Sequence, residues 1–121
     1  MRGREREEIN KGGRKVYPGD IDGVAERFEL TLDVCTFGYD DPLRGEDVAM
    51  AVVLKYASHE NIRGLHNWLK QHLARFQMPQ RWYLLTEIPR TSRGKVNRSK
   101  VAQDCASLEP IDHRSIVRER G

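Results

Sequence analysis

Apolar side chains recur at helical spacing in two stretches of the chain. The longer stretch follows Ser58 and predicts a helix of about fifteen residues that ends before Met78-Pro79. Its apolar stripe consists of Ile62, Leu65, Trp68, Leu69, Leu73 and Phe76. The shorter stretch covers residues 21–28 and follows Pro18, which suits a first helical turn because its missing N–H needs no partner there. A third, short helix is expected over residues 98–105.

Three other apolar runs predict β-strands. Residues 32–37 and 48–56 are rich in β-branched and aromatic side chains, and we expect them to pair antiparallel. Residues 39–47 lie between them and contain Asp-Asp-Pro and Arg-Gly-Glu, which predict a long loop. A third strand is expected over residues 82–88, which carry Trp82, Leu84 and Ile88 before Pro89.

A glycine pair near the N-terminus predicts a β-hairpin. Gly12-Gly13 separates two short polar and apolar runs at residues 6–10 and 14–17, which is typical of a two-residue turn. The elements together predict an α+β fold: a short N-terminal β-hairpin and a three-stranded mixed sheet packed against two to three helices. We divide the chain into a hinge or linker over residues 1–6, one domain over residues 7–105, and a tail over residues 106–121 whose weak periodicity predicts partial flexibility.

Composition is consistent with one small domain. The 121 residues suffice for a single core, and 38% apolar with 32% charged residues predict a folded domain with a heavily charged surface. No apolar run approaches the ~20 residues of a membrane helix, and the MRGRERE start has no apolar segment behind it. We therefore expect no membrane partner, no signal peptide and a cytoplasmic location.

Cysteine and histidine positions indicate no metal or disulfide site. The two cysteines, Cys35 and Cys105, lie far apart and outside any C-x-x-C pattern, so we expect two reduced and partly buried thiols. The four histidines show no spacing typical of metal ligands with acids or cysteines. The sequence thus predicts no metal ligands in this chain.

The most unusual stretch is a basic loop before the last helix. Five Lys or Arg residues and no acid lie between Ile88 and Gln103. A mobile basic loop with an exposed lysine suits a clamp for phosphate or carboxylate, although most basic loops are simply solvated surface. Gly94-Lys95 is similar to the end of a P-loop, but that motif needs a glycine where Pro89 stands and a Ser or Thr where Val96 stands.

This loop carries a family resemblance. Residues 89–98, PRTSRGKVNR, resemble the last conserved motif of adenylate-forming enzymes, P-x-T-x-x-G-K-[IV]-x-R. The N-terminal segment resembles their hinge and hairpin motif, with Ile21-Asp22 in place of the usual Ile-Glu. Residues 38–46 fit the stretch V-x-G-x-x-D…G-E, and residues 69–79 fit the helix end L-x-x-x-L-x-x-[FY]-x-x-P. In order and spacing, the chain resembles the C-terminal lid domain of the superfamily of acyl- and aryl-CoA synthetases, peptide-synthetase adenylation domains and luciferases.

The resemblance implies an AMP-forming ligase that works in two steps. ATP with Mg²⁺ and the acid are bound mainly by a large N-terminal domain, in the same polypeptide or as a separate protein. An acyl-adenylate forms first, and a thiol from CoA or from the phosphopantetheine of a carrier protein then takes the acyl group. The lid domain rotates between the steps, so we expect no activity from this chain alone.

Roles for individual residues follow from their family positions. The resemblance implies that Lys95 is the catalytic lysine of adenylation and, with Arg4, contacts the nucleotide. Arg6 takes the hinge position, where Asp or Lys is usual. The remaining residues shape the two moving segments: Thr91, Ser92 and Gly94 support the lysine loop, and Gly12, Gly13 and Lys11 line the path of the thiol.

Two other functions remain open from the sequence. The domain could be a non-catalytic docking platform for a carrier protein, although retention of Lys95 argues against this. It could also be a basic nucleic-acid-binding module, yet it shows no recognised motif of that class and Glu5, Glu7 and Glu8 dilute its N-terminal charge. We therefore do not expect a nucleic-acid partner, and the choice between CoA and a carrier protein stays open.

Overall fold

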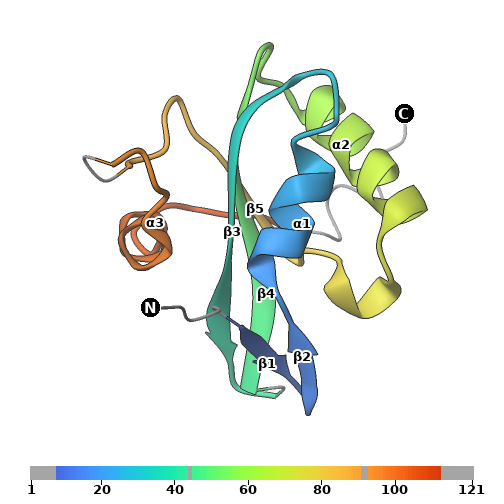
Figure 1. Cartoon of the computed structure of the whole chain (residues 1–121), viewed down its shortest axis with the longest axis vertical. Coiled ribbons are helices and arrows are strands. Elements are labelled where there is room, and N and C mark those ends of the chain that lie inside the picture. Colours follow the sequence, from blue (N-terminus) through green and yellow to red (C-terminus); the bar gives the residue numbers. More distant parts are fainter. Residues whose placement is uncertain (1–7, 44, 91–92, 113–121) are drawn as a thin grey trace.

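The computed structural model describes residues 8–43, 45–90 and 93–112. Its strands are β1 (Ile9–Lys11), β2 (Arg14–Val16), β3 (Thr31–Asp41), β4 (Gly45–Leu54), β5 (Arg81–Leu84) and β6 (Ile111–Asp112). Its helices are α1 (Pro18–Ala25), α2 (His59–His72) and α3 (Arg98–Cys105), with a short 3₁₀ turn, η1, at Arg75–Gln77. Helices α1 and α2 lie on one face of the sheet and α3 lies on the other (Figure 1).

Strand β4 organises the sheet. It pairs antiparallel with β3 along its whole length, and on its other side it pairs with β1 at Gly45 and in parallel with β5 at residues 49–52. Helix α2 makes the crossover that a parallel pair requires. The order is β2-β1-β4-β5-β6, with β3 also on β4, so the predicted α+β fold with a mixed sheet and three helices is confirmed.

The connection between β3 and β4 differs from the prediction. Residues 39–47 do not form a long loop, because β3 continues to Asp41 and β4 begins at Gly45. Tyr39 pairs with Asp47, and Asp40 pairs with Glu46. The sequence pattern did not reveal these strand ends, because their side chains are polar. A hairpin arm that extends beyond the core is held by backbone pairing and does not need apolar side chains. The N-terminal hairpin also joins the main sheet, through the pairing of Lys11 with Gly45.

The sheet has a further strand near the C-terminus. Ile111 and Asp112 form β6 and pair antiparallel with Trp82 and Arg81 of β5. The sequence analysis placed these two residues in the tail and did not predict a strand there. Residues 113–121 and the hinge segment 1–6 lie outside the described part of the chain.

Two apolar layers hold the sheet between the helices. The layer under α1 and α2 contains Trp82, which is fully buried, and the layer under α3 contains Cys35 and Cys105 as buried thiols that form no disulfide. Burial raises the pKa of the Cys105 thiol to about 11, with a smaller contribution from Asp104. Three residues of the predicted stripe, Ile62, Leu65 and Leu69, are fully buried on α2, whereas Leu73 and Phe76 lie beyond the end of this helix at His72 and are partly buried. None of the helices in the described residues is long and apolar enough to cross a bilayer.

The burial difference between two leucines gives a direct stability prediction. Leu65 on α2 is fully buried, whereas Leu32 on β3 is 62% exposed. Leu65→Ala should lower the free energy of unfolding by about 2–5 kcal/mol through lost burial and a cavity. The matched change Leu32→Ala should cost under about 0.5 kcal/mol. Urea denaturation followed by circular dichroism measures both, and equal losses would contradict the described core.

Candidate functional site

The basic loop between β5 and α3 is fixed at its start by an ion pair. The Arg90 guanidinium binds Asp33 of β3, with Nη2 on Oδ1 and Nε donating to Oδ2 at 3.3 Å. The third group, Nη1, donates to the Gly94 carbonyl at 3.0 Å. Arg90 and Val96 also form an isolated antiparallel bridge. The loop therefore folds back on itself immediately before and after Lys95.

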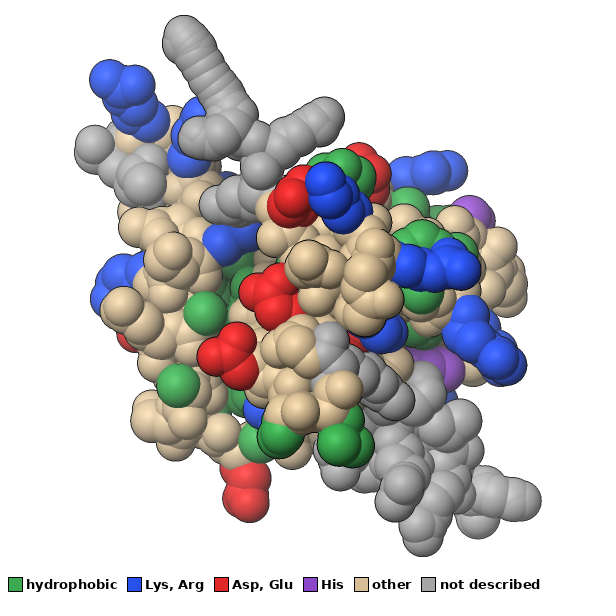
Figure 2. Space-filling view, turned by 90° about the horizontal axis from the view of Figure 1, so that it is seen from below, with side chains coloured by type: hydrophobic (Ala, Val, Ile, Leu, Met, Phe, Trp, Pro, Cys, Tyr) green, Lys and Arg blue, Asp and Glu red, His purple; other side chains and the backbone are tan. Residues whose placement is uncertain are grey.

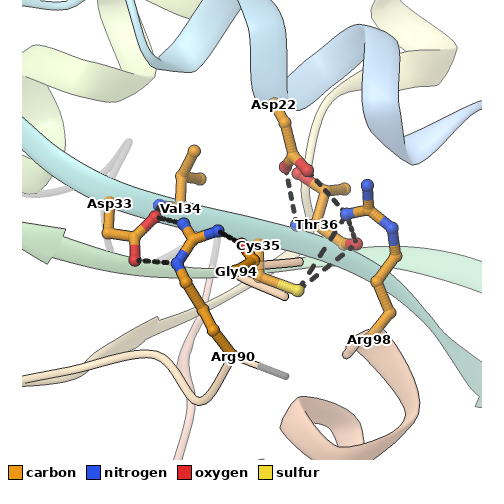
Figure 3. Close-up of polar contacts among 8 residues, drawn as sticks. All are labelled: Asp22, Asp33, Val34, Cys35, Thr36, Arg90, Gly94 and Arg98. Carbon is orange, nitrogen blue, oxygen red and sulfur yellow. Dashed lines mark hydrogen bonds and ion pairs between the residues drawn. The ribbon is translucent and has the colours of Figure 1, made fainter. Parts of the chain in front are cut away.

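A second ion pair fixes the end of the loop, where α3 begins. Arg98 Nη1 donates to Asp22 Oδ2 of α1 at 2.5 Å and to the Thr36 carbonyl of β3 at 3.0 Å. Asp22 Oδ1 accepts the Thr36 N–H at 2.8 Å. Figure 3 shows both anchors side by side along β3, with Asp33 facing the guanidinium of Arg90 and Thr36 between Asp22 and Arg98. Elements from both faces of the sheet thus meet on one strand.

The two anchors lie in different electrostatic surroundings. Asp22 is buried, and burial raises the pKa of its carboxyl, while Arg98 and the Thr36 hydrogen bonds act in the opposite direction. The Arg90–Asp33 pair is more open, with 39% and 24% of the two side chains exposed. Removing one partner of a buried pair is costly, whereas an exposed pair contributes little to stability. The Arg98–Asp22 anchor therefore holds the domain together, and the Arg90–Asp33 anchor acts locally on the loop.

Lys95 is presented on the surface between these anchors. Lys95 and Gly94 are both exposed, and Gly94 has a φ of +85°, which suits glycine because a Cβ is disfavoured there. Asn97 then caps α3 by accepting the Lys100 N–H at 3.1 Å. Thr91 and Ser92, which the sequence analysis assigned to loop support, lie outside the described residues.

The Gly12-Gly13 turn forms as the sequence predicts. Its φ angles are +56° and +92°, and the Asn10 Oδ1 atom accepts the Gly13 N–H at 3.2 Å. A Cβ built on either glycine would meet nothing within 4 Å. Positive φ at both central residues is typical of the two-residue turn whose twist matches that of the flanking strands. Because neither glycine has a side chain, no side chain covers the backbone of this turn. The backbone at this turn is therefore open to close approach.

Lys11, the third residue assigned to the thiol path, has an anchoring contact of its own. Its ammonium lies 3.2 Å from Asp47 Oδ1 and donates to the Phe76 carbonyl at 3.2 Å. Asp47 is fully buried, so this contact pairs a buried charge. Lys11 thereby ties the hairpin to β4 and to the segment after α2.

A groove of about 500 Å³ lies beside the hairpin, lined by Lys11, Arg14, Arg75, Phe76 and Gln80. The Arg14 guanidinium stands 4.7 Å from the centre of the Phe76 ring. Figure 2 views the molecule from this hairpin end, with Lys and Arg side chains both on the side where α2 lies and on the opposite side, where α3 lies. The sequence pattern does not predict Arg75 at this place, because Arg75 lies about sixty positions beyond the hairpin.

The described residues divide the candidate site into two parts. The Lys95 loop and the Gly12-Gly13 turn stand at opposite ends of the sheet (Figure 1). Within the described ranges, no group of three or more His, Cys, Asp or Glu side chains could hold a metal ion. Arg4 and Arg6, expected at the nucleotide and the hinge, fall before the described residues.

Comparison with known proteins identifies the family. The family described as "AMP-binding enzyme C-terminal domain" matches residues 21–95. The oxalate–CoA ligase of Saccharomyces cerevisiae is 35% identical over 106 residues, covering 88% of this chain and 20% of that protein. An uncharacterized acyl–CoA ligase of Bacillus subtilis is 36% identical over 99 residues, covering 82% and 20%.

Solved structures show the same fold. The acyl-CoA synthetase of Brucella canis superposes with a TM-score of 0.77 at 22% identity, over 88% of this chain and 20% of that one. The fold and the matched residues define a small α+β domain of an AMP-binding enzyme. The chain belongs to the family of AMP-binding enzyme C-terminal domains, as the motifs predicted. It spans about a fifth of the length of the relatives it matches.

The buried anchor can be tested through Arg98. Arg98→Met keeps the side-chain stem but leaves the buried Asp22 carboxylate without its cation, so we expect a loss of about 3 kcal/mol in unfolding free energy at pH 7. Because Arg98 lowers the pKa of Asp22, its removal raises that pKa further. Proton binding by Asp22 then stabilises the fold fully below the ordinary Asp value of 3.8, and this contribution is lost as pH rises through the raised pKa.

The measurement is urea denaturation at pH 4 and pH 7. The deficit of Arg98→Met should be smaller at pH 4. Lys100→Met is the matched control, because Lys100 pairs with Asp104 on the exposed side of the same helix. It should cost under about 0.5 kcal/mol at either pH. A deficit that does not depend on pH would show that Asp22 is not the group left unpaired.

Proposed function

We propose that this chain is the C-terminal domain of an ATP-dependent carboxylic acid:CoA ligase, with Lys95 acting in adenylation and the Gly12-Gly13 turn in thiol transfer. The observation that carries the proposal is the separation of these two features at opposite ends of one rigid sheet (Figure 1). One active site cannot contact both ends at once. A domain built this way suits a lid that presents one end in each step.

In the first step, an oxygen of the carboxylate attacks the α-phosphorus of ATP. A P–O bond to the leaving pyrophosphate breaks as the new P–O bond forms, and the products are an acyl-adenylate and pyrophosphate. Two anions must approach each other, so an ammonium group that reaches both lowers the barrier. Lys95 fits this role because its side chain is exposed while its backbone is anchored on both sides.

Other groups of the first step belong to the larger protein. We propose that an N-terminal adenylation domain, in the same polypeptide or in trans, binds ATP, Mg²⁺ and the acid. Arg4 would then contact the nucleotide, and Arg6 would lie at the hinge between the domains. Thr91 and Ser92 would shape the Lys95 loop together with Gly94.

In the second step, a thiol sulfur attacks the acyl carbon and AMP leaves. The thiol arrives on a long pantetheine arm, and the bare Gly12-Gly13 backbone gives it a narrow path. The groove lined by Arg14 and Arg75 lies beside this turn and suits the phosphates of CoA. The relatives named above are CoA ligases, which supports CoA as acceptor over a carrier protein.

Lys95→Ala tests the adenylation role. We would join this chain to the N-terminal domain of the S. cerevisiae oxalate–CoA ligase and measure ATP–pyrophosphate exchange with oxalate. Lys95→Ala should reduce exchange at least about 100-fold, because the lost ammonium stabilises charge only in the transition state. Lys70→Met, on α2 at the opposite face, should leave exchange unchanged. Equal exchange by Lys95→Ala and the unmutated chimera would refute the role.

Gly12→Asn tests the thiol path. Asn is accepted at the first position of this turn, so the hairpin should keep its fold while gaining a side chain on its surface. We expect transfer of the acyl group to CoA to slow about tenfold or more, while ATP–pyrophosphate exchange stays within twofold. Rapid-quench assays of each step, with circular dichroism of the variant, give the answer. If both steps slow together, the turn does not act in thiol transfer.

A further inference from the structure

One guanidinium group connects the sheet to the peptide that carries Lys95. Arg90 uses Nε and Nη2 on the two oxygens of Asp33 and Nη1 on the Gly94 carbonyl, 3.0 Å away. The Gly94 carbonyl belongs to the peptide unit whose N–H is that of Lys95. This bond acts on a peptide at which Gly94 has no side chain and no neighbour within 4 Å of its Cβ position.

The base of this connection is itself fixed. Asp33 Oδ1 accepts the Val34 N–H at 3.0 Å, which holds the carboxylate against its own strand. Val34 is buried in the layer under α1 and α2 and pairs with Val52 in the centre of the sheet. The Asp33 carboxylate is therefore held in place on β3, and its ion pair with Arg90 restrains the loop.

The contact differs from the neighbouring Arg98 anchor in what it joins. Arg98 binds α1 and β3, so its loss affects the whole domain. Among the described residues, Arg90 binds β3 and the Lys95 loop, and its side chain is 39% exposed. An exposed pair contributes roughly 0–1 kcal/mol to folding, so its main effect lies in the geometry of the loop.

We propose that Arg90 is a positioning residue for adenylation, which holds the Gly94–Lys95 peptide so that the Lys95 ammonium enters the active site in one orientation. The inference rests on the proposed function of Lys95 and adds to it a named residue and its base, Asp33. A misplacement of about 1 Å in a reacting group can cost about 100-fold in rate. Gly94 has no Cβ to restrict its backbone dihedral angles, so the bond from Arg90 supplies a restraint that the residue itself lacks.

The geometry also requires arginine. A guanidinium has five N–H donors in a plane and can bind a carboxylate with one edge while another N–H reaches a carbonyl. A lysine ammonium is a single point of charge and cannot reproduce both contacts from the same place. Arg90→Lys therefore keeps the charge and the pairing with Asp33 but loses the bond to Gly94.

The first experiment uses this chain alone. ¹⁵N relaxation should show faster motion of the Gly94 and Lys95 amides in Arg90→Lys, with the amides of α3 and β3 unchanged and the denaturation midpoint within experimental error. Asp33→Asn should show the same local change, and Lys70→Met should show none. Unchanged relaxation at Gly94 and Lys95 in Arg90→Lys would overturn the proposal.

The second experiment uses the oxalate–CoA ligase chimera. Arg90→Lys should lower kcat for adenylate formation about tenfold or more, with KM for ATP and oxalate within twofold. Transfer to CoA from adenylate already formed on the enzyme should keep its rate. The double variant Arg90→Lys with Lys95→Ala should be no slower than Lys95→Ala alone, because Arg90 acts through that lysine.

A charge exchange separates positioning from simple pairing. Asp33→Arg with Arg90→Asp restores the ion pair but removes the donor to Gly94, so adenylation should remain slow. Full recovery by this variant would show that only the pair matters and would overturn the proposal. A strong effect of Lys95→Ala together with normal adenylation by Arg90→Lys refutes this inference alone, whereas a normal Lys95→Ala refutes the proposed function.

Discussion

The peptide groups of Thr36, on β3, are the point on which the two layers of the domain depend. The N–H donates to Asp22 from α1 on one face, and the carbonyl accepts from Arg98 of α3 on the other. Asp22 and Arg98 also form an ion pair with each other. The Thr36 peptide groups, the carboxylate and the guanidinium thus provide one another with hydrogen-bond partners in a largely buried environment. Without this contact, α3 would have only a short apolar face with which to hold its position.

The same strand bears on the proposed function, in which the domain serves two chemical steps. The Lys95 loop is fixed on β3 near Asp33, while the Gly12-Gly13 turn extends from β1, which pairs with the far end of β4. Antiparallel pairing of β3 and β4 over their whole length makes the distance between these two features constant. In the proposed function, the domain would change which end it offers by moving as one body, without a change in its own conformation.

Sequence reasoning predicted the parts whose signal lies in side-chain type or in short fixed spacing. The apolar stripe of α2, the Gly12-Gly13 turn and the antiparallel pairing of β3 with β4 follow from such patterns, and the structure confirms them. It failed at residues 39–47, where a hairpin arm outside the core carries polar side chains. It also could not find Asp33 as the partner of Arg90, because a contact between positions 57 residues apart depends on how the strands pair.

The salt bridge of Lys11 has a mechanical consequence. Its ammonium reaches the buried Asp47 of β4 and the carbonyl of Phe76, so the short hairpin is braced from two sides at its last residue before the turn. A two-stranded ribbon of three residues per strand would bend easily by itself. These two contacts stiffen the hairpin. If the domain rotates, the Gly12-Gly13 turn therefore moves together with the rest of it.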